Sequence, residues 1–128
     1  MAHRILIVDD EAMITKSLQK LLKKQGYDVT IVTNGKEALE KIKNEDFDLF
    51  ILDIRMPEMD GIETLQAARK IVSDSKKKPI PEIVITGYAD EEKYKAAVEL
   101  KVRSYIYKPF DTQEFLNTIQ KVLNDVSQ

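Results

Sequence analysis

Short apolar runs alternate with amphipathic stretches along the whole chain. Four of the runs are Ile5–Val8, Leu49–Leu52, Ile83–Ile85 and Tyr105–Tyr107. Short runs that are apolar at consecutive positions are typical of strands that helices cover on both faces of a parallel sheet. The alternation occurs five times, and it predicts an α/β fold, (βα)5, with a doubly wound five-stranded parallel sheet of order 2-1-3-4-5.

Residues that begin and end helices support this division. Asn34, with Glu37 three positions later, predicts a capped helix start, and Asp111 with Glu114 predicts another. Gly26 follows an apolar helical pattern and is a natural residue to end that helix. The first, second and fifth predicted helices therefore each have a start or stop signal of their own.

Two further segments have simpler interpretations. A helix capped by Asp90 is expected to place three residues on its apolar face, Tyr94, Ala97 and Val98. The polar connection 73–81 contains three consecutive lysines and is expected to be a solvated loop.

Composition narrows the class of protein. The 128 residues suffice for one domain, residues 1–128, and the net charge of −2 predicts no direct nucleic-acid binding. The chain has no cysteine, which excludes disulfides and zinc–thiolate sites. It has no apolar run near the roughly 20 residues that span a bilayer, and no apolar secretory segment at its start. We therefore expect a cytoplasmic protein that does not contact membranes.

Acidic residues follow two of the apolar runs directly. Asp9 and Asp10 follow Ile5–Val8, and Asp53 follows Leu49–Leu52. In a parallel sheet these positions meet at the carboxyl edge, where ligands bind in open α/β sheets. Carboxylates crowded at one edge repel one another, and Mg²⁺ prefers such oxygen ligands. The pattern predicts a divalent-cation site.

A lysine and a hydroxyl group at the same edge indicate the kind of chemistry in which the cation takes part. Lys108 follows Tyr105–Tyr107, and Thr86 follows Ile83–Ile85. Phosphoryl transfer requires mainly positioning and neutralisation of charge, and an aspartate can accept the group as an aspartyl-phosphate. Each of these residues alone could be an ordinary helix cap, turn hydroxyl or surface charge. Their combination at the strand ends favours phosphoryl chemistry.

Four motifs resemble one known family. They are Ile-Val-Asp-Asp-Glu at 7–11, the segment from Asp53 to Gly61, Thr86-Gly-Tyr, and Tyr105-Ile-Tyr-Lys-Pro at 105–109. In this order they resemble the receiver domain of response regulators in two-component signalling, over essentially all 128 residues. The resemblance implies the flavodoxin-like, CheY-like version of the predicted fold.

The resemblance also implies roles for residues at the strand ends. Asp53 would be the phosphoacceptor, and Thr86 and Lys108 would contact the phosphoryl group. Thr86 and Tyr105 would form the switch that responds to it. Mg²⁺, or Mn²⁺ in its place, would be held by the side chains of Asp9, Asp10 and Asp53 and the backbone carbonyl of Arg55.

Partners follow from the same family. A sensor histidine kinase or histidine phosphotransfer domain would supply the phosphoryl group in a phosphorelay, and an output domain or protein would respond. The protein would be a monomer or a phosphorylation-dependent dimer. Arg55 and Tyr88 flank the acceptor region and are expected to tune the lifetime of the phosphorylated form. Docking of the donor is expected at Ala12, Met13, Ile14 and Phe110.

Three other functions compete with this interpretation. A degenerate receiver would act as a protein-interaction module without phosphorylation. A phosphatase of the haloacid-dehalogenase type needs a second aspartate two residues after the nucleophile, where this chain has Arg55. A flavin-binding protein would place its phosphate loop after the first strand, where two carboxylates would repel phosphate. We therefore expect a signalling phosphoacceptor with limited self-phosphorylation and autodephosphorylation, and not a metabolic enzyme.

Overall fold

The structure is a computed structural model of the 128-residue chain. It describes residues 3–9, 12–54, 61–86, 91–107 and 111–127.

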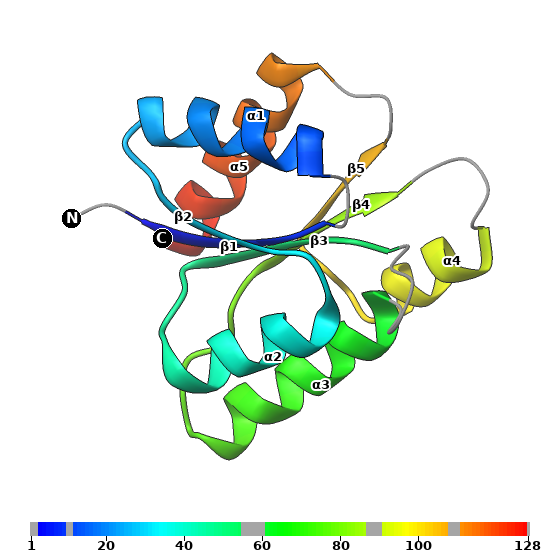
Figure 1. Ribbon diagram of the computed structural model, residues 1–128. Coiled ribbons are helices and arrows are strands. Elements are labelled where there is room, and N and C mark those ends of the chain that lie inside the picture. Colours follow the sequence, from blue (N-terminus) through cyan, green and yellow to red (C-terminus); the bar gives the residue numbers. More distant parts are fainter. Residues whose placement is uncertain (1–2, 10–11, 55–60, 87–90, 108–110, 128) are drawn as a thin grey trace.

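The described residues form one parallel sheet with helices on both faces (Figure 1). The strands are β1 (Arg4–Val8), β2 (Asp28–Val32), β3 (Leu49–Asp53), β4 (Glu82–Thr86) and β5 (Ser104–Tyr107). Their order is β2-β1-β3-β4-β5, which confirms the predicted topology. The helices are α1 (Ala12–Lys24), α2 (Gly35–Asn44), α3 (Gly61–Asp74), α4 (Glu91–Glu99) and α5 (Thr112–Ser127).

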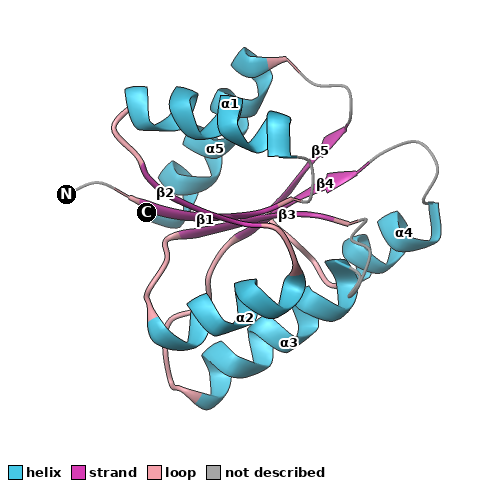
Figure 2. Ribbon diagram, in the orientation of Figure 1, coloured by secondary structure: helices cyan, strands magenta, loops and turns pink. Residues whose placement is uncertain are grey.

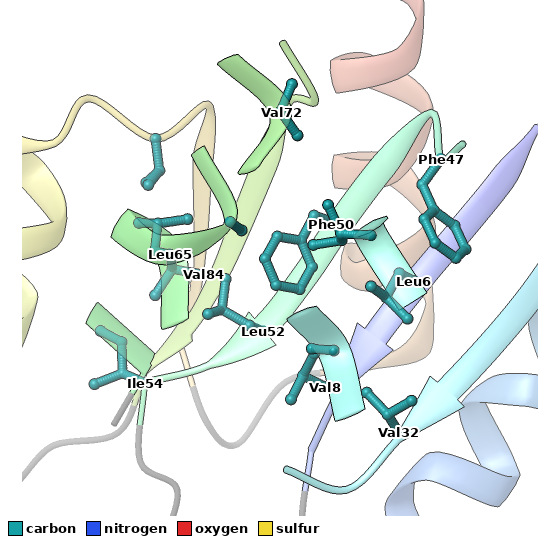
Figure 3. Packing of buried hydrophobic residues seen from close by; sticks show 14 of the residues in the cluster. Leu6, Val8, Val32, Phe47, Phe50, Leu52, Ile54, Leu65, Val72 and Val84 are labelled. Carbon is teal, nitrogen blue, oxygen red and sulfur yellow. The ribbon is translucent and has the colours of Figure 1, made fainter. Parts of the chain in front are cut away.

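Alternate strand residues supply two separate hydrophobic cores. One core contains Leu6, Phe50 and Val84 together with residues of α2 and α3, and Figure 3 shows its centre. The other contains Ile7, Ile51 and residues of α5. Figures 1 and 2 show the corresponding layers, with α1 and α5 on one face of the sheet and α2 and α3 on the other. Because successive side chains of a strand point to opposite faces, strands buried on both faces are apolar at every position.

Three of the predicted helix signals are confirmed. The side chain of Asn34 accepts a 2.9 Å hydrogen bond from the amide of Glu37. The side chain of Asp111 accepts one of 2.6 Å from the amide of Glu114. Gly26 follows α1 with φ of 92°, the left-handed conformation that glycine adopts without steric cost.

The predicted apolar face of α4 is wrong at one position. Val98 is 46% exposed, whereas Ala97 is fully buried. Neighbouring residues of a helix point about 100° apart, so the two cannot face the same core equally well. Leu100 and Val102, beyond the end of α4, complete the core instead. Asp90 and the side chain of Tyr94 lie outside the described residues.

The loop between α3 and β4 is only partly the solvated connection that we expected. Lys78 is exposed, but Lys77 is half-buried. The amino group of Lys77 pairs with the carboxylate of Asp46 at 3.1 Å and donates to the carbonyl of Ile42 at 3.3 Å. The loop is therefore tied to α2 and to the residues that follow it.

In the described ranges, the structure has no helix that is long and apolar enough to cross a membrane.

Candidate functional site

Asp9 and Asp53 lie side by side at the carboxyl edge of the sheet. They follow Val8 and Leu52, the last pair in register between the neighbouring strands β1 and β3. Adjacent strands lie about 4.8 Å apart, so the two backbones run close together at this point. Both aspartates are buried, with exposed fractions of 0% and 4%. Two acidic groups predicted to meet at this edge do so.

Backbone hydrogen bonds continue the sheet to the two aspartates and beyond. The amide of Asp9 donates to the carbonyl of Val32 at 3.2 Å, which ties this residue to β2. The amide of Ile54 donates to the carbonyl of Ile85 at 3.0 Å, on β4. Asp53 is therefore held within a regular ladder, and its position does not depend on a free loop.

Gly61 lies against the end of the strand that carries Asp53. Its amide donates to the carbonyl of Ile54 at 2.9 Å. A Cβ atom on Gly61 would lie 2.6 Å from the Cα atom of Ile54 and 2.7 Å from the carbonyl oxygen of Asp53. Only glycine permits this approach. The start of α3 is therefore fixed against the backbone at the end of β3.

The switch pair predicted from the family falls on β4 and β5. Thr86 is the last residue of β4 and is in register with Tyr107, and Val84 is in register with Tyr105. Tyr105 is half-buried and packs against the core on the α3 face. Tyr107 is 52% exposed. Of the two tyrosines of β5, Tyr105 is therefore the one that packs against this core.

Several predicted site residues lie outside the described residues. They are Asp10, Arg55, Tyr88, Lys108 and Phe110, together with the side chains of Thr86, Ala12, Met13 and Ile14. The structure brings Asp9, Asp53 and the backbone of Thr86 to one edge of the sheet, and α1 begins three residues after Asp9.

The oxygen ligands available at this edge suit a hard divalent cation. Asp9 and Asp53 both offer carboxylate oxygens, which Mg²⁺ prefers. Among the described residues no group of three metal-ligating side chains forms, and the third predicted carboxylate, Asp10, is outside them. Two buried carboxylates on neighbouring strands would also repel each other, which a cation would relieve.

One partly buried ion pair was not anticipated from the sequence. The guanidinium of Arg69 on α3 donates to both carboxylate oxygens of Glu82, at 2.8 and 2.6 Å, at the start of β4. The hydrogen bonds that Arg69 donates to Glu82 raise the pKa of Arg69. A charged residue at the start of an apolar run was the available signal, since it requires a partner when buried. The pair fixes α3 to the sheet at the edge opposite Asp53.

Comparison with known proteins identifies the family. The family model of the response regulator receiver domain matches residues 5–120. The chain is 36% identical over 125 residues to the chemotaxis protein CheY of Bacillus subtilis, covering 97% of this chain and 100% of that protein. The chain therefore belongs to the response regulator receiver family, the phosphoacceptor modules of two-component signal transduction.

Solved structures agree with this assignment. A CheY-like response regulator receiver domain protein from Methanospirillum hungatei superimposes with a TM-score of 0.88 at 35% identity, covering 98% of this chain and 96% of that one. The receiver domain of the sensor histidine kinase PA1611 from Pseudomonas aeruginosa, with magnesium coordinated in its active-site cleft, has the same fold at 23% identity, with a TM-score of 0.83 and coverage of 97% and 99%.

Many relatives are longer proteins. The transcriptional regulatory protein ZraR of Escherichia coli is 35% identical over 119 residues, which cover 93% of this chain but 26% of ZraR. The chain thus spans about a quarter of that regulator and the whole of CheY.

Proposed function

We propose that Asp53 is the residue that accepts the phosphoryl group. The observation that carries this proposal is that Asp53 and Asp9, both buried, lie next to each other at the carboxyl ends of the neighbouring strands β3 and β1. This is the edge at which open α/β sheets bind ligands. The close approach of Gly61 supports it, because it fixes the start of α3 against the backbone of Asp53 and Ile54.

The proposed reaction is a simple displacement at phosphorus. A carboxylate oxygen of Asp53 forms a bond to the phosphorus atom as the bond from phosphorus to the donor breaks. The donor leaves with the electron pair of that bond, as free imidazole from phosphohistidine or as acetate from acetyl phosphate. The developing charge is spread over the phosphoryl oxygens, and Lys108 and Thr86 are proposed to contact them.

A divalent cation fits the acidic groups on this edge. The side chains of Asp9, Asp10 and Asp53 and the carbonyl of Arg55 would hold Mg²⁺, with Mn²⁺ in its place as an alternative. When bound, the ion supplies positive charge that lets a phosphoryl group approach the carboxylates. Asp9 contributes by presenting an oxygen ligand from a fixed position after β1, next to the acceptor.

Phosphorylation is proposed to change the face formed by α4, β5 and α5. Thr86 would contact the phosphoryl group, and Tyr105 would turn inward in response. A phosphoryl group shifts such an equilibrium only if it stabilises one state more than the other. Half-burial of Tyr105 leaves this ring room to change its exposure in either direction.

The remaining proposals concern partners and self-catalysed reactions. A histidine kinase or phosphotransfer domain would dock beside Asp53, over Ala12, Met13, Ile14 and Phe110. An output domain or protein would read the switched face, either from a monomer or from a phosphorylation-dependent dimer. Labelling by small donors and slow self-catalysed hydrolysis would occur at the same carboxylate, with Arg55 and Tyr88 setting the lifetime of the product.

The dependence on the acidic pair can be tested directly. Acetyl phosphate with Mg²⁺ should add one phosphoryl group to the intact protein, and excess chelator should prevent it. Asp9→Asn should reduce the labelling rate by about tenfold or more at limiting Mg²⁺, and higher Mg²⁺ should restore part of it. Asp125→Asn, at an exposed position on α5, is the matched control. If excess chelator leaves the labelling of wild-type protein unchanged, the proposal of a metal-dependent site is wrong. If wild-type protein is not labelled at all, the result favours a degenerate receiver.

A further inference from the structure

A concave site lies at the amino edge of the sheet, opposite Asp53. It is a cavity of about 550 Å³, within the roughly 300–1,000 Å³ typical of small-molecule sites. We call it the amino-edge cavity. It lies between α3, the loop that leads to β4, and the connection from α4 to β5. Helix α3 starts against Ile54 at the acceptor edge and runs to this opposite edge (Figure 1).

The cavity combines apolar and cationic side chains with one hydroxyl group, of Ser73, and one carboxylate, of Glu82. Six of its lining residues are apolar: Phe50, Ala68, Val72, Pro79, Ile80 and Pro81. Five others are cationic: Arg69, Lys76, Lys77, Lys101 and Arg103. A ligand that fills it would need an apolar body and negative charge.

Only part of this positive charge is neutralised within the protein. Arg69 is bound by Glu82, and Lys77 is paired with Asp46. The other three, Lys76, Lys101 and Arg103, form no ion pair with any carboxylate in the described parts of the chain. All three are exposed. They come from two different segments, so they place positive charge on two sides of the cavity.

The backbone gives a second reason to regard two of these lysines as more than surface charges. Lys76 and Lys101 have φ of 57° and 59°, and they are the two non-glycine residues in this left-handed region among the described residues. Side chains are strained there, and glycine is not. Lys76 lies two residues after the end of α3, and Lys101 lies two residues after the end of α4.

Helix α1 shows what the same turn looks like away from the cavity. Its end is closed by Gly26, whose amide donates to the carbonyl of Lys23 at 3.0 Å, followed by a bond from Tyr27 to Leu22. The end of α3 has the same two bonds, from Lys76 to Ser73 and from Lys77 to Val72, both at 3.1 Å. The turn therefore accepts glycine, yet at the cavity the chain has lysine in the strained position.

We propose that the amino-edge cavity binds a phosphorylated small molecule of about mononucleotide size, with a flat aromatic ring. The ring would lie on the apolar floor, and the phosphate would be held by Lys76, Lys101 and Arg103. A phosphate monoester carries about −1.5 to −2 charge near pH 7, which suits this group of cations. Lysine binds phosphate as a point charge without requiring the planar geometry that arginine imposes. This site is separate from Asp53 and independent of its proposed role.

The test is a titration of the full chain with AMP and with GMP, followed by amide NMR. Saturable shifts are expected for the amides of residues 73–78, 80 and 101–103. Adenosine, guanosine and inorganic phosphate should each bind much more weakly than the nucleotides. The proposal is overturned if neither nucleotide shifts these amides, or if inorganic phosphate alone binds as well as AMP and GMP. Shifts caused by polyglutamate but by neither nucleotide would also overturn it, in favour of an acidic protein partner.

Glycine substitutions separate binding from folding. Lys76→Gly and Lys101→Gly should each weaken nucleotide binding by roughly tenfold, because each removes one cation from the phosphate. Neither should lower the urea midpoint, because glycine relieves the backbone strain. Lys78→Ala, in the same lysine run but outside the lining, is the matched control and should bind as wild type.

A third variant covers the case in which glycine loosens the turns. Arg103→Gln removes the cation without introducing glycine, and it should also weaken nucleotide binding by roughly tenfold. Unchanged affinity in all three variants would show that these cations do not hold the ligand. Acetyl phosphate labelling of Asp53 should stay at the wild-type level in each variant, so a failure here remains distinct from a failure of the acceptor site.

Discussion

The amide of Gly61 donates a 2.9 Å hydrogen bond to the carbonyl of Ile54, the residue that follows Asp53. This contact joins the first residue of α3 to the end of β3. It leaves no room for a side chain, since a Cβ atom would lie 2.6 Å from the backbone of Ile54. The geometry beyond the proposed acceptor therefore depends on a glycine that is itself not an acid, a base or a ligand.

Gly61→Ala should disturb both stability and labelling. The added methyl group must displace the backbone of Asp53 and Ile54. Overpacking of this kind lowers the free energy of unfolding by about 1–3 kcal/mol. We expect a lower urea midpoint and slower labelling by acetyl phosphate.

Gly26→Ala is the matched control for this prediction. A Cβ atom on Gly26 would have no other atom within 4 Å, but the φ of this residue is +92°. Alanine there should cost about 1–2 kcal/mol through backbone strain alone and leave labelling of the folded protein unchanged. If Gly61→Ala labels at the wild-type rate, the close approach is not needed for the acceptor site.

The Arg69–Glu82 pair should contribute to stability mainly through the buried carboxylate. The side chain of Glu82 is 8% exposed, whereas that of Arg69 is 38% exposed. Arg69→Met should cost roughly 2 kcal/mol, because it leaves a buried charge without its bidentate partner. The double variant Arg69→Met/Glu82→Met should recover most of that loss. Urea denaturation of the two single variants and the double variant measures the coupling, and additive losses would show that the pair does not act as a unit.

The proposed switch predicts a response far from Asp53 in the sequence. Beryllofluoride with Mg²⁺, a phosphoryl mimic, should shift the amide resonances from Glu91 to Lys101, because inward movement of Tyr105 would change the packing of α4. Tyr105→Ala should abolish most of this response while leaving the shifts next to Asp53. Unchanged resonances over α4 in the wild-type protein would contradict the switch.

The fold could be predicted from the sequence because the apolar runs and the helix-capping residues indicated the same arrangement of strands and helices. Apolar runs without alternation required a sheet buried on both faces, and the caps at Asn34 and Asp111 fixed two helix starts. Where neighbouring residues differ only by their direction on a helix, the pattern was too coarse, and Val98 was wrongly placed in the core. Apolarity alone does not tell which of two adjacent residues faces inward.

The site was predictable only in part. Strand ends brought Asp9 and Asp53 together because a parallel sheet aligns its carboxyl ends. The charge of Glu82 signalled the need for a partner, but not that this partner is Arg69, 13 positions earlier. The amino-edge cavity could not be predicted, because part of its lining comes from a loop that looked merely polar. The backbone angles of Lys76 and Lys101 leave no signal in sequence at all.

The lifetime of the phosphorylated form should depend on Arg55 and Tyr88. Neither is a good general base near neutral pH, because arginine stays protonated and tyrosine titrates near pH 10. If they border the approach of water to phosphorus, they should slow hydrolysis, and each tenfold effect corresponds to about 1.4 kcal/mol. Decay of the radiolabelled protein should be faster in Arg55→Asn/Tyr88→Glu than in wild type. Equal or slower decay would remove the proposed shielding.

The identity of the phosphoacceptor is tested most directly by intact mass. Wild-type protein incubated with acetyl phosphate and Mg²⁺ should gain the mass of one phosphoryl group, and Asp53→Asn should gain none under the same conditions while retaining the wild-type urea transition within about 1 kcal/mol. An Asp53→Asn protein that gains the same mass at the same rate as wild type would contradict the assignment of Asp53 as the acceptor.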